Sequence, residues 1–382
     1  MISRRTFLHA TAGLGAATLT GWPRPAFAQT QPEAAVGLAR CDTYEFEAVH
    51  NALGAALDRI GGIDTLVGGK TVTIKPNLVG EMDETFNGIS PQRSYQIHSM
   101  VALALAHLVA AAGASRIRFV ESLHSRASFA TQLGRAGWDV SLFTENQVGA
   151  PLEFQDTRNL GSWDDYAEFP VPGGGLIFPA FHLNRAYTET DVFISLAKMK
   201  EHQSAGVTLS MKNLFGAIPL SLYSNNAGTS GDENATSYLD RTFHWGSVDP
   251  AEGVPTELDP TSSREDEVRV PRIIVDVASA RPIDLAVIDA IETIRGAEGP
   301  WGPDVWHDTP GLLLVGRNPV ATDAVAMDFM GHDPAAPDYD PPFKGINHVA
   351  LAAAQGLGTN DLSRIDVREV GVDGPRSALI LR

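Results

Sequence analysis

Five polar side chains lie close together in a strongly apolar part of the chain. Residues 192–219 read VFISLAKMKEHQSAGVTLSMKNLFGAIP. The polar members of interest are Lys198, Lys200, His202, Lys212 and Asn213. Lysine is costly to bury, so lysines within apolar sequence need either paired carboxylates or a bound anion. The cluster is therefore a candidate site for a negatively charged ligand.

More polar residues directly follow short apolar runs elsewhere in the chain. The runs at 71–74, 117–120, 192–196, 285–288 and 312–315 are apolar on both faces, which is typical of strands in a mostly parallel sheet. The carboxyl ends of parallel strands share one sheet edge, where ligands bind in open α/β folds. The residues that we expect at this edge are Lys75, Asn77, Glu121, Lys198, Lys200, His202, Asp289 and Asn318.

Residues 204–218 have the apolar spacing of a helix that ends before Pro219. In such a helix Lys212 borders the buried face, where it either points its amine to water or faces a ligand. A second helix at 320–330, capped by Asn318, places Asp323 among apolar side chains. A buried carboxylate needs a partner or a metal, and we expect one of the clustered lysines to pair with it.

These residue types suggest particular roles in the site. Lys75, Lys198, Lys200 and Lys212 would neutralise an anion, while Asn77 and Asn213 would orient it. We expect His202 to act as general acid or base, because histidine titrates near neutrality, with Lys200 and Lys212 as further catalytic candidates. Asp289 and Asp323 would position lysines or a metal. Glu121, Asp289, Glu298 and His202 could together hold a divalent metal, although they lack the helical ligand spacing of common zinc motifs.

Helical patterns connect the predicted strands. Residues 99–112 form a clear helix closed by Gly113, and residues 347–354 form another that ends at Gly356. The predicted fold class is therefore α/β, with a mostly parallel central sheet flanked by helices. Two stretches interrupt this pattern: a β-rich excursion at about 139–185, and a long polar insertion at about 222–271 that is either a lid or a mobile surface segment.

The first residues predict export. Arg4 and Arg5 form a twin-arginine pattern, which is followed by an Ala- and Gly-rich run and by Ala26-Phe27-Ala28. We interpret residues 1–28 as a signal peptide cleaved after Ala28, and residues 29–382 as one α/β domain. The twin-arginine export machinery is then a partner, and the periplasm is the predicted location. No stretch of the mature chain is long and apolar enough to span a membrane.

The composition of the chain limits which partners and cofactors it can bind. Removal of residues 1–28 takes away Arg4, Arg5 and Arg24 and no acid, which leaves 26 basic against 46 acidic side chains, a net charge of −20. Nucleic acid is a poor partner for such a surface. Cys41 is the only cysteine, so the chain cannot build an iron–sulfur cluster from its own thiolates.

Short motifs in the chain resemble the family named domain of unknown function 362. The matching pieces are Lys75-Pro76-Asn77-Leu78, Ala112-Gly113-Ala114, Lys198-Met199-Lys200-Glu201-His202, Met211-Lys212-Asn213-Leu214-Phe215-Gly216, Val287-Ile288-Asp289-Ala290, Glu298-Gly299-Pro300 and Asn318-Pro319-Val320-Ala321-Thr322-Asp323-Ala324-Val325. Many relatives in that family carry added ferredoxin-type cysteine motifs, which this chain lacks, so the resemblance does not support electron transfer. A more distant likeness to lactate-racemase-type proteins concerns architecture alone.

Three hypotheses follow. The first is an exported enzyme that acts on a small phosphorylated or carboxylated compound in a lysine-rich cleft, with or without a metal. The second is a periplasmic ligand-binding or cofactor-handling protein with the same cleft and no catalysis. The third is that the lysines form only structural ion pairs.

Overall fold

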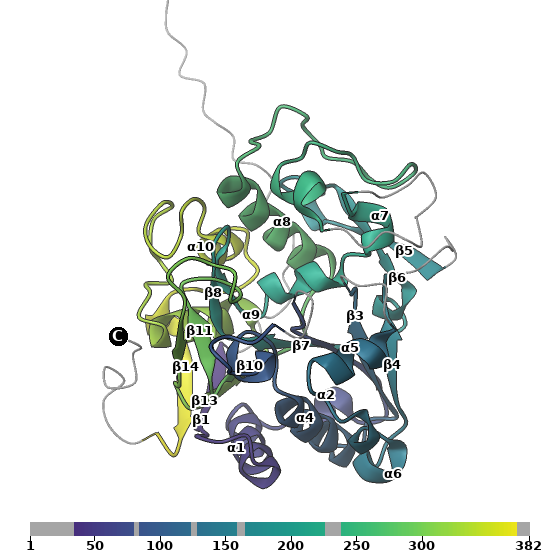
Figure 1. Cartoon of the computed structure of the whole chain (residues 1–382), viewed down its shortest axis with the longest axis vertical. Helices are drawn as coiled ribbons and strands as arrows, with labels where there is room; N and C mark the ends of the chain where they lie inside the picture. The colour runs from purple at the N-terminus through teal and green to yellow at the C-terminus, as the bar shows by residue number, and fades with distance from the viewer. Residues whose placement is uncertain (1–33, 80–83, 124–127, 159–164, 226–237, 373–382) are drawn as a thin grey trace, which may run out of the picture. The chain divides into compact units, whose positions relative to one another are not determined.

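An eight-stranded sheet forms the centre of the chain (Figure 1). The computed structural model describes residues 34–79, 84–123, 128–158, 165–225 and 238–372, and the predicted signal peptide lies outside these ranges. The strands, in their spatial order, are β14 (Asp366–Val370), β1 (Ala35–Arg40), β13 (Leu312–Gly316), β10 (Leu285–Ala290), β7 (Val192–Lys198), β2 (Thr71–Pro76), β3 (Arg116–Glu121) and β4 (Leu152–Asp156). All five predicted strands are present, and the α/β class is confirmed.

Strand direction decides which residues meet. β10, β7, β2, β3 and β4 pair in parallel, whereas β13 is antiparallel to both of its neighbours, β10 and β1. The carboxyl end of β13 therefore lies at the opposite edge from Lys75 and Glu121. Asn318, which follows β13, caps the next helix by accepting a hydrogen bond from Ala321 N at 3.0 Å. Its predicted place at the shared edge is wrong, because that prediction assumed a parallel strand.

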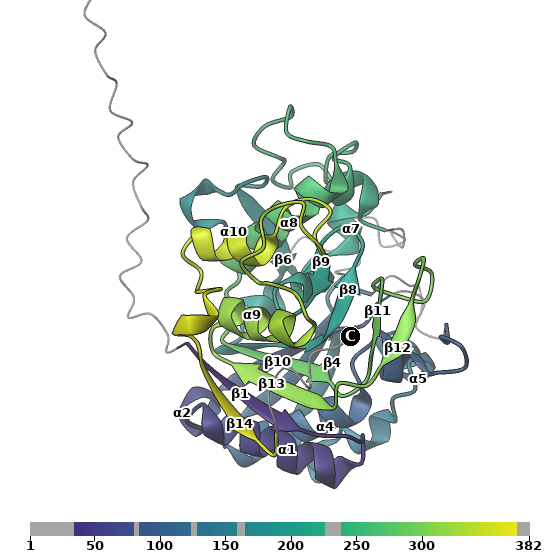
Figure 2. The same ribbon diagram turned by 90° about the vertical axis from the view of Figure 1, so that its left-hand side faces the viewer.

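Helices cover both faces of the sheet, as Figure 2 shows. One apolar core includes α1 (Phe46–Arg59) and α4 (Ser99–Ala111), and the other includes α8 (Asp266–Ala280), α9 (Pro319–Phe329) and α10 (His348–Ala354). β7 contributes Ile194 to the first core and Phe193 to the second, because successive strand side chains point to opposite faces. Both faces are thus buried, which explains the unbroken apolar runs. The predicted helices at 99–112, 320–330 and 347–354 are present to within one residue.

Shorter elements complete the described part of the chain. Three antiparallel pairs stand apart from the main sheet: β5 (Tyr166–Pro170) with β6 (Ala180–Asn184), β8 (Lys200–His202) with β9 (Gly206–Thr208), and β11 (Thr293–Arg295) with β12 (Trp306–Asp308). The short α-helices are α2 (Asp64–Val67), α3 (Pro91–Ser94), α5 (Phe129–Arg135), α6 (Glu145–Val148) and α7 (Leu220–Tyr223). Within the stretch read as a β-rich excursion, β4 joins the main sheet and β5 and β6 form a separate hairpin.

The segment at 204–218 differs from the predicted helix. It contains β9, and then a 3₁₀ helix, η5, from Lys212 to Ala217. Ser210 N and Met211 N donate to the carboxylate of Asp323, at 2.8 and 3.0 Å, so they are not available for helical hydrogen bonds to earlier carbonyls. The apolar residues of the expected stripe are buried all the same, since the hairpin and the 3₁₀ turn pack them into the core. A tertiary contact has overridden the local pattern.

Candidate functional site

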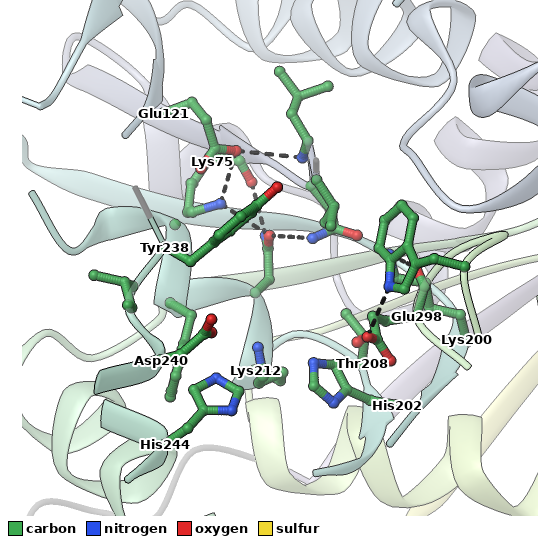
Figure 3. A pocket seen from close by; sticks show the side chains of 18 of the residues that line it. Lys75, Glu121, Lys200, His202, Thr208, Lys212, Tyr238, Asp240, His244 and Glu298 are labelled. Atoms are coloured by element: carbon green, nitrogen blue, oxygen red, sulfur yellow. Dashed lines mark hydrogen bonds and ion pairs between the residues drawn. The ribbon is translucent and has the colours of Figure 1, made fainter. Parts of the chain in front are cut away.

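A pocket lies beyond the carboxyl ends of β2 and β3 and beside the β8–β9 hairpin (Figure 3). It encloses about 430 Å³. The polar lining includes Lys75, Asn77, Glu121, Lys200, His202, Thr208, Lys212, Asn213, Asp240, His244 and Glu298, and Trp301 and Tyr238 also line it. Four of the six lysines in the chain, Lys75, Lys198, Lys200 and Lys212, are those that we expected to neutralise an anion and are called the lysine cluster below; three of these four line this pocket. Of the eight residues expected at the shared sheet edge, five line this pocket, whereas Lys198, Asp289 and Asn318 do not.

Lys75 is already saturated with protein partners. Its ammonium group donates to Glu121 Oε2, Asn213 Oδ1 and Pro76 O at 3.0, 3.0 and 2.9 Å. An ammonium group has three N–H donors, so none remains for a ligand. Lys75 and Glu121 are each only 1 % exposed, and burial raises the pKa of Glu121 to about 7 and lowers the pKa of Lys75. This pair supports the wall of the pocket.

Hydrogen bonds fix the orientations of the side-chain amides of Asn213 and Asn77. Asn213 Nδ2 donates to Lys75 O and Ser195 Oγ, both at 3.0 Å, so its Oδ1 faces Lys75 Nζ and Asn77 Nδ2. Asn77 Oδ1 is consequently turned away from Asn213 and has no hydrogen-bond partner among the described residues, although Asn77 is only 4 % exposed. Asn77 lines the pocket with a buried acceptor that a ligand could satisfy.

Lys198 and Asp289 form a separate buried cluster that does not line the pocket. The Lys198 ammonium donates to Asp289 Oδ2, Tyr44 Oη and Gln92 O at 3.0, 2.9 and 3.1 Å, which again uses all three donors. Both charged side chains are 0 % exposed. The structural ion-pair hypothesis therefore describes Lys198 and Asp289, as it describes Lys75 and Glu121.

Lys200 retains part of its donor capacity. Its ammonium group donates to Tyr95 O at 2.6 Å and Glu298 O at 2.9 Å, two backbone carbonyls, and it makes no ion pair with a described side chain. Burial is the main reason that the pKa of Lys200 is lowered to about 7; the charge of Glu298 opposes this effect, and the charges of Lys212, Lys198 and Lys75 add to it. One N–H of the ammonium form remains for a ligand.

Lys212 is the least engaged cation in the pocket. It begins η5, and its Nζ lies 4.1 Å from the centre of the Phe215 ring. Among the described residues it makes no hydrogen bond and no ion pair through Nζ. Burial and the charge of Lys75 lower its pKa to about 8, while Glu298 acts in the opposite direction without contacting it. All three donors of the ammonium form are thus available.

His202 differs from its predicted behaviour. Ser204 N and Ala205 N donate to His202 Nδ1 at 3.2 and 3.3 Å, so a neutral ring carries its proton on Nε2. Burial and the neighbouring charge of Lys212 lower the pKa of His202 well below its ordinary value. The reason for choosing it as an acid–base group, titration near neutrality, is therefore wrong. The ring is suited instead to donating one hydrogen bond to a ligand.

Asp323 does not pair with a lysine. Its carboxylate accepts hydrogen bonds from Ser210 N, Ser210 Oγ and Met211 N at 2.8, 2.6 and 3.0 Å, and the residue is 0 % exposed. Burial raises its pKa to about 7, and these hydrogen bonds oppose that rise. Asp323 acts on the site indirectly, because it holds the backbone immediately before Lys212.

The four predicted metal ligands are not gathered around one point. Glu121 binds Lys75, Asp289 binds Lys198, and Glu298 accepts hydrogen bonds from Gln203 N and Trp301 Nε1 at 3.2 and 3.0 Å. Across the described ranges, no group of three or more His, Cys, Asp or Glu side chains could hold a metal ion. These contacts do not support a metal at the predicted ligands.

His244 and Gly216 line the pocket and were not predicted from the sequence as site residues. His244 comes from the polar insertion, on a short π-helix from Asp240 to His244, and its Nδ1 lies 3.8 Å from Asp266. Gly216 lies where a side chain would collide with Lys75 and Glu121. The sequence around His244 gives no signal of a site, whereas Gly216 belongs to a motif whose glycine had no assigned role.

Similar proteins provide the remaining evidence. A family model described as domain of unknown function (DUF362) matches residues 72–328, about two thirds of the chain, and a twin-arginine translocation signal model matches residues 1–21. The thylakoid-associated protein sll1697 of Synechocystis sp. is 25% identical over 305 residues, covering 78% of this chain and 75% of that protein.

Solved structures show only distant likeness. The lactate racemase apoprotein of Thermoanaerobacterium thermosaccharolyticum has a TM-score of 0.37 and 14% identity, covering 72% of this chain and 55% of that one. A Thermotoga maritima protein has a TM-score of 0.36 and 11% identity, covering 71% and 56%. This chain thus spans little more than half of each solved chain.

The export signal and the family agree with the sequence reading. No helix in the described ranges is long and apolar enough to cross a membrane. The twin-arginine match shows a chain addressed to that export route. Because the family model covers most of the sheet and the whole lysine cluster, the chain belongs to the DUF362 family.

Proposed function

We propose that the mature protein is periplasmic, that its signal is cleaved after Ala28, and that it binds a small carboxylate or phosphate compound in the pocket around Lys212. The observation that carries this proposal is the donor count. Lys75 and Lys198 have no donors left, whereas Lys212 offers three and Lys200 one. The cluster thus separates into structural pairs and cations that are available to a ligand.

The electrostatics favour an anion near Lys212. Partly buried cations that repel one another are costly, and an anion between them would offset that cost. Four carboxylates line the pocket: Glu84, Glu121, Asp240 and Glu298. Glu121 and Glu298 already accept hydrogen bonds from other groups, and none of the four forms an ion pair with Lys200 or Lys212 among the described residues. A ligand oxygen could accept hydrogen bonds from Lys212, Lys200 and His202.

Two buried polar atoms extend the description of the ligand. Thr208 and Asn77 line the pocket and are only 3 % and 4 % exposed. Thr208 Oγ1 and Asn77 Oδ1 have no hydrogen-bond partner among the described residues. An unsatisfied buried acceptor costs about 1–3 kcal/mol. A ligand that carries a hydroxyl or N–H donor besides its anionic group would satisfy Asn77.

Catalysis remains part of this proposal, with Lys200, Lys212 and His202 as the groups that would contact the substrate. The alternative is a non-catalytic ligand-binding or cofactor-handling protein that uses the same donors. Substitution of His202 by Gln separates the two: turnover is lost if His202 acts in the chemistry, while ligand affinity largely persists if the ring only lines the pocket.

Isothermal titration calorimetry with inorganic phosphate, glycolate and 3-phosphoglycerate tests binding. We expect at least one probe to bind, and Lys212→Met to weaken it at least tenfold, about 1.4 kcal/mol. The control is Lys344→Met, since Lys344 is exposed and outside the pocket. Equal affinity in both variants contradicts the proposal.

Protein matured in its own host supplies a second measurement. Native mass spectrometry should reveal a retained small anion, and N-terminal sequencing should begin at Gln29. A host-matured protein with no retained compound, together with no binding of the three probes, would reject the anion site.

A further inference from the structure

We infer that Lys212 is a nucleophilic amine that forms an imine with the carbonyl carbon of a small oxo acid bound in this pocket. This inference rests on the proposed function, which supplies the site for the acid's anionic group. It goes further by naming a substrate class, compounds with a carboxylate next to a ketone or aldehyde, and by assigning a covalent role to one side chain.

Geometry distinguishes Lys212 from the other three lysines of the cluster. A nucleophilic amine needs a free lone pair and must be able to lose its own hydrogen bonds. Lys75 and Lys198 are each tied to a buried carboxylate at 3.0 Å, which favours the charged form. Lys212 Nζ has no such partner among the described residues, and Figure 3 shows it pointing into the pocket.

Lys200 is the nearest competitor, and its contacts exclude it. Its nitrogen donates to two backbone carbonyls, Tyr95 O and Glu298 O. A protonated imine nitrogen carries only one hydrogen, so imine formation at Lys200 would leave one of these carbonyls without its donor. Lys212 gives up no hydrogen bond of this kind. Lys200 can therefore supply charge for the carboxylate while Lys212 attacks the carbonyl.

The ionisation of Lys212 supports this assignment. Its pKa of about 8, lowered by burial and by Lys75, leaves about a tenth of the amine neutral at about pH 7. An ordinary lysine, with a pKa of about 10.4, is almost wholly charged under the same conditions. Lowering a lysine pKa by burial and by a second cation is an established way to activate this nucleophile.

The step balances without any further reactant. The Nζ lone pair adds to the carbonyl carbon, the carbonyl oxygen takes up a proton, and the nitrogen loses one, which gives a carbinolamine. The hydroxyl group then leaves as water after receiving a proton, and the C=N bond forms. Overall, one amine and one carbonyl yield one imine and one water, with no oxidation or reduction.

Two histidines lie next to the position of this reaction. His202 and His244 lie on either side of Lys212 in Figure 3. The charges of Lys212 and His244 both lower the pKa of His202. His244 Nδ1 lies 3.8 Å from Asp266 Oδ2. His202 carries a proton on Nε2, and it can donate a hydrogen bond to the carbinolamine oxygen.

Reductive trapping tests the inference on the full mature chain. Pyruvate is added with sodium cyanoborohydride, which delivers hydride to a protonated imine and leaves a stable secondary amine. We expect one reduced pyruvate per chain by intact mass, located at Lys212 by peptide mapping. Acetone, which lacks the carboxylate, should react at least tenfold more slowly. The adduct yield should increase between about pH 6 and about pH 8, as Lys212 loses its proton.

Matched variants identify the reacting group. Lys212→Arg keeps a positive charge but cannot form the imine, so the adduct should disappear. Lys344→Arg should trap pyruvate as the parent protein does, and circular dichroism confirms that both variants fold. Peptide mapping of the parent protein alone also decides the matter, because label spread equally over Lys70, Lys344 and the terminal amine contradicts a specific site.

The outcomes separate the two proposals. Calorimetric binding of pyruvate that Lys212→Met weakens, without any adduct, rejects the imine and leaves the anion pocket standing. A specific adduct at Lys212 supports both. Absence of an adduct, together with no binding of pyruvate or of the three earlier probes, rejects both.

Discussion

At the scale of single residues, counting hydrogen-bond donors assigns different roles to lysines that look alike in sequence. The sequence identifies Lys75, Lys198, Lys200 and Lys212 as one cluster, and three of them do line one pocket. It cannot show which ammonium groups are already used, because their partners, such as Glu121 at 46 positions from Lys75, lie far away in the chain. Residue types indicate where a candidate site lies, but only the contacts show which of its ammonium groups have hydrogen-bond donors left among the described residues.

The pair of Lys198 and Asp289 provides a test of this division. Because both are fully buried, Lys198→Met and Asp289→Asn should each lower the free energy of unfolding by about 3–5 kcal/mol. The double variant should lose at least about 1 kcal/mol less than the sum, since neither charge is left unpaired. Urea unfolding measures these values, and the phosphate affinity of folded single variants should stay within about twofold of the parent.

An exposed pair serves as the control for this cycle. The carboxylate of Asp366 lies 2.7 Å from Arg368 Nε, with 62% of the Asp366 side chain exposed. Asp366→Asn should cost less than about 1 kcal/mol. Additive losses for Lys198 and Asp289, or losses as small as this control, would show that the buried pair is not coupled as described.

At the scale of elements, the predicted strands are confirmed, but their directions could not be predicted from sequence. The apolar run of β13 looks like those of β7 and β10, yet it is antiparallel to β10. Nothing in LLLVG encodes direction, which follows from the length and packing of the connections. The same limit explains the 204–218 segment: its spacing suits a helix, but Asp323, 113 positions from Ser210, takes up the N–H groups.

Gly216 lets η5 approach the buried pair of Lys75 and Glu121. A Cβ at this position would contact Glu121 Oε1 and would lie 2.5 Å from Lys75 Nζ. Gly216→Ala should therefore disrupt the pair and lower the free energy of unfolding by about 2–4 kcal/mol. Phosphate affinity should also decrease, because η5 carries Lys212. Urea unfolding and calorimetry check the two effects.

The matched control for Gly216 lies on α5. Gly134 is helical and has no atom within 4 Å of an added Cβ. Gly134→Ala should leave stability unchanged or raise it by up to about 1 kcal/mol, because alanine is the better helix former. A Gly216→Ala protein as stable as the Gly134→Ala protein would mean that the backbone does not approach the pair closely enough to require glycine.

At the scale of the whole molecule, the ligand-free pocket should make stability depend on pH in an unusual direction. The pKa values of Lys200 and Lys212 are about 7 and about 8, well below that of a lysine in an unfolded chain. Between these values and about 10.4 the unfolded chain binds more protons than the folded chain. The free energy of unfolding must then increase as pH rises through this interval.

We expect the free energy of unfolding of the ligand-free protein to increase by about 3–4 kcal/mol between about pH 7 and about pH 9. Below about pH 7 both folded lysines are charged and their full destabilising effect is present; it diminishes as they lose protons.

The double variant Lys200→Met with Lys212→Met should remove most of the increase, whereas Lys70→Met with Lys344→Met should keep it. Urea unfolding across this interval provides the measurement. A bound anion should flatten the profile as well, because it keeps both lysines protonated in the folded state. A profile that falls with pH, or an increase that persists in the Lys200 and Lys212 double variant, would show that these amines do not share the strained, partly desolvated environment on which anion binding depends.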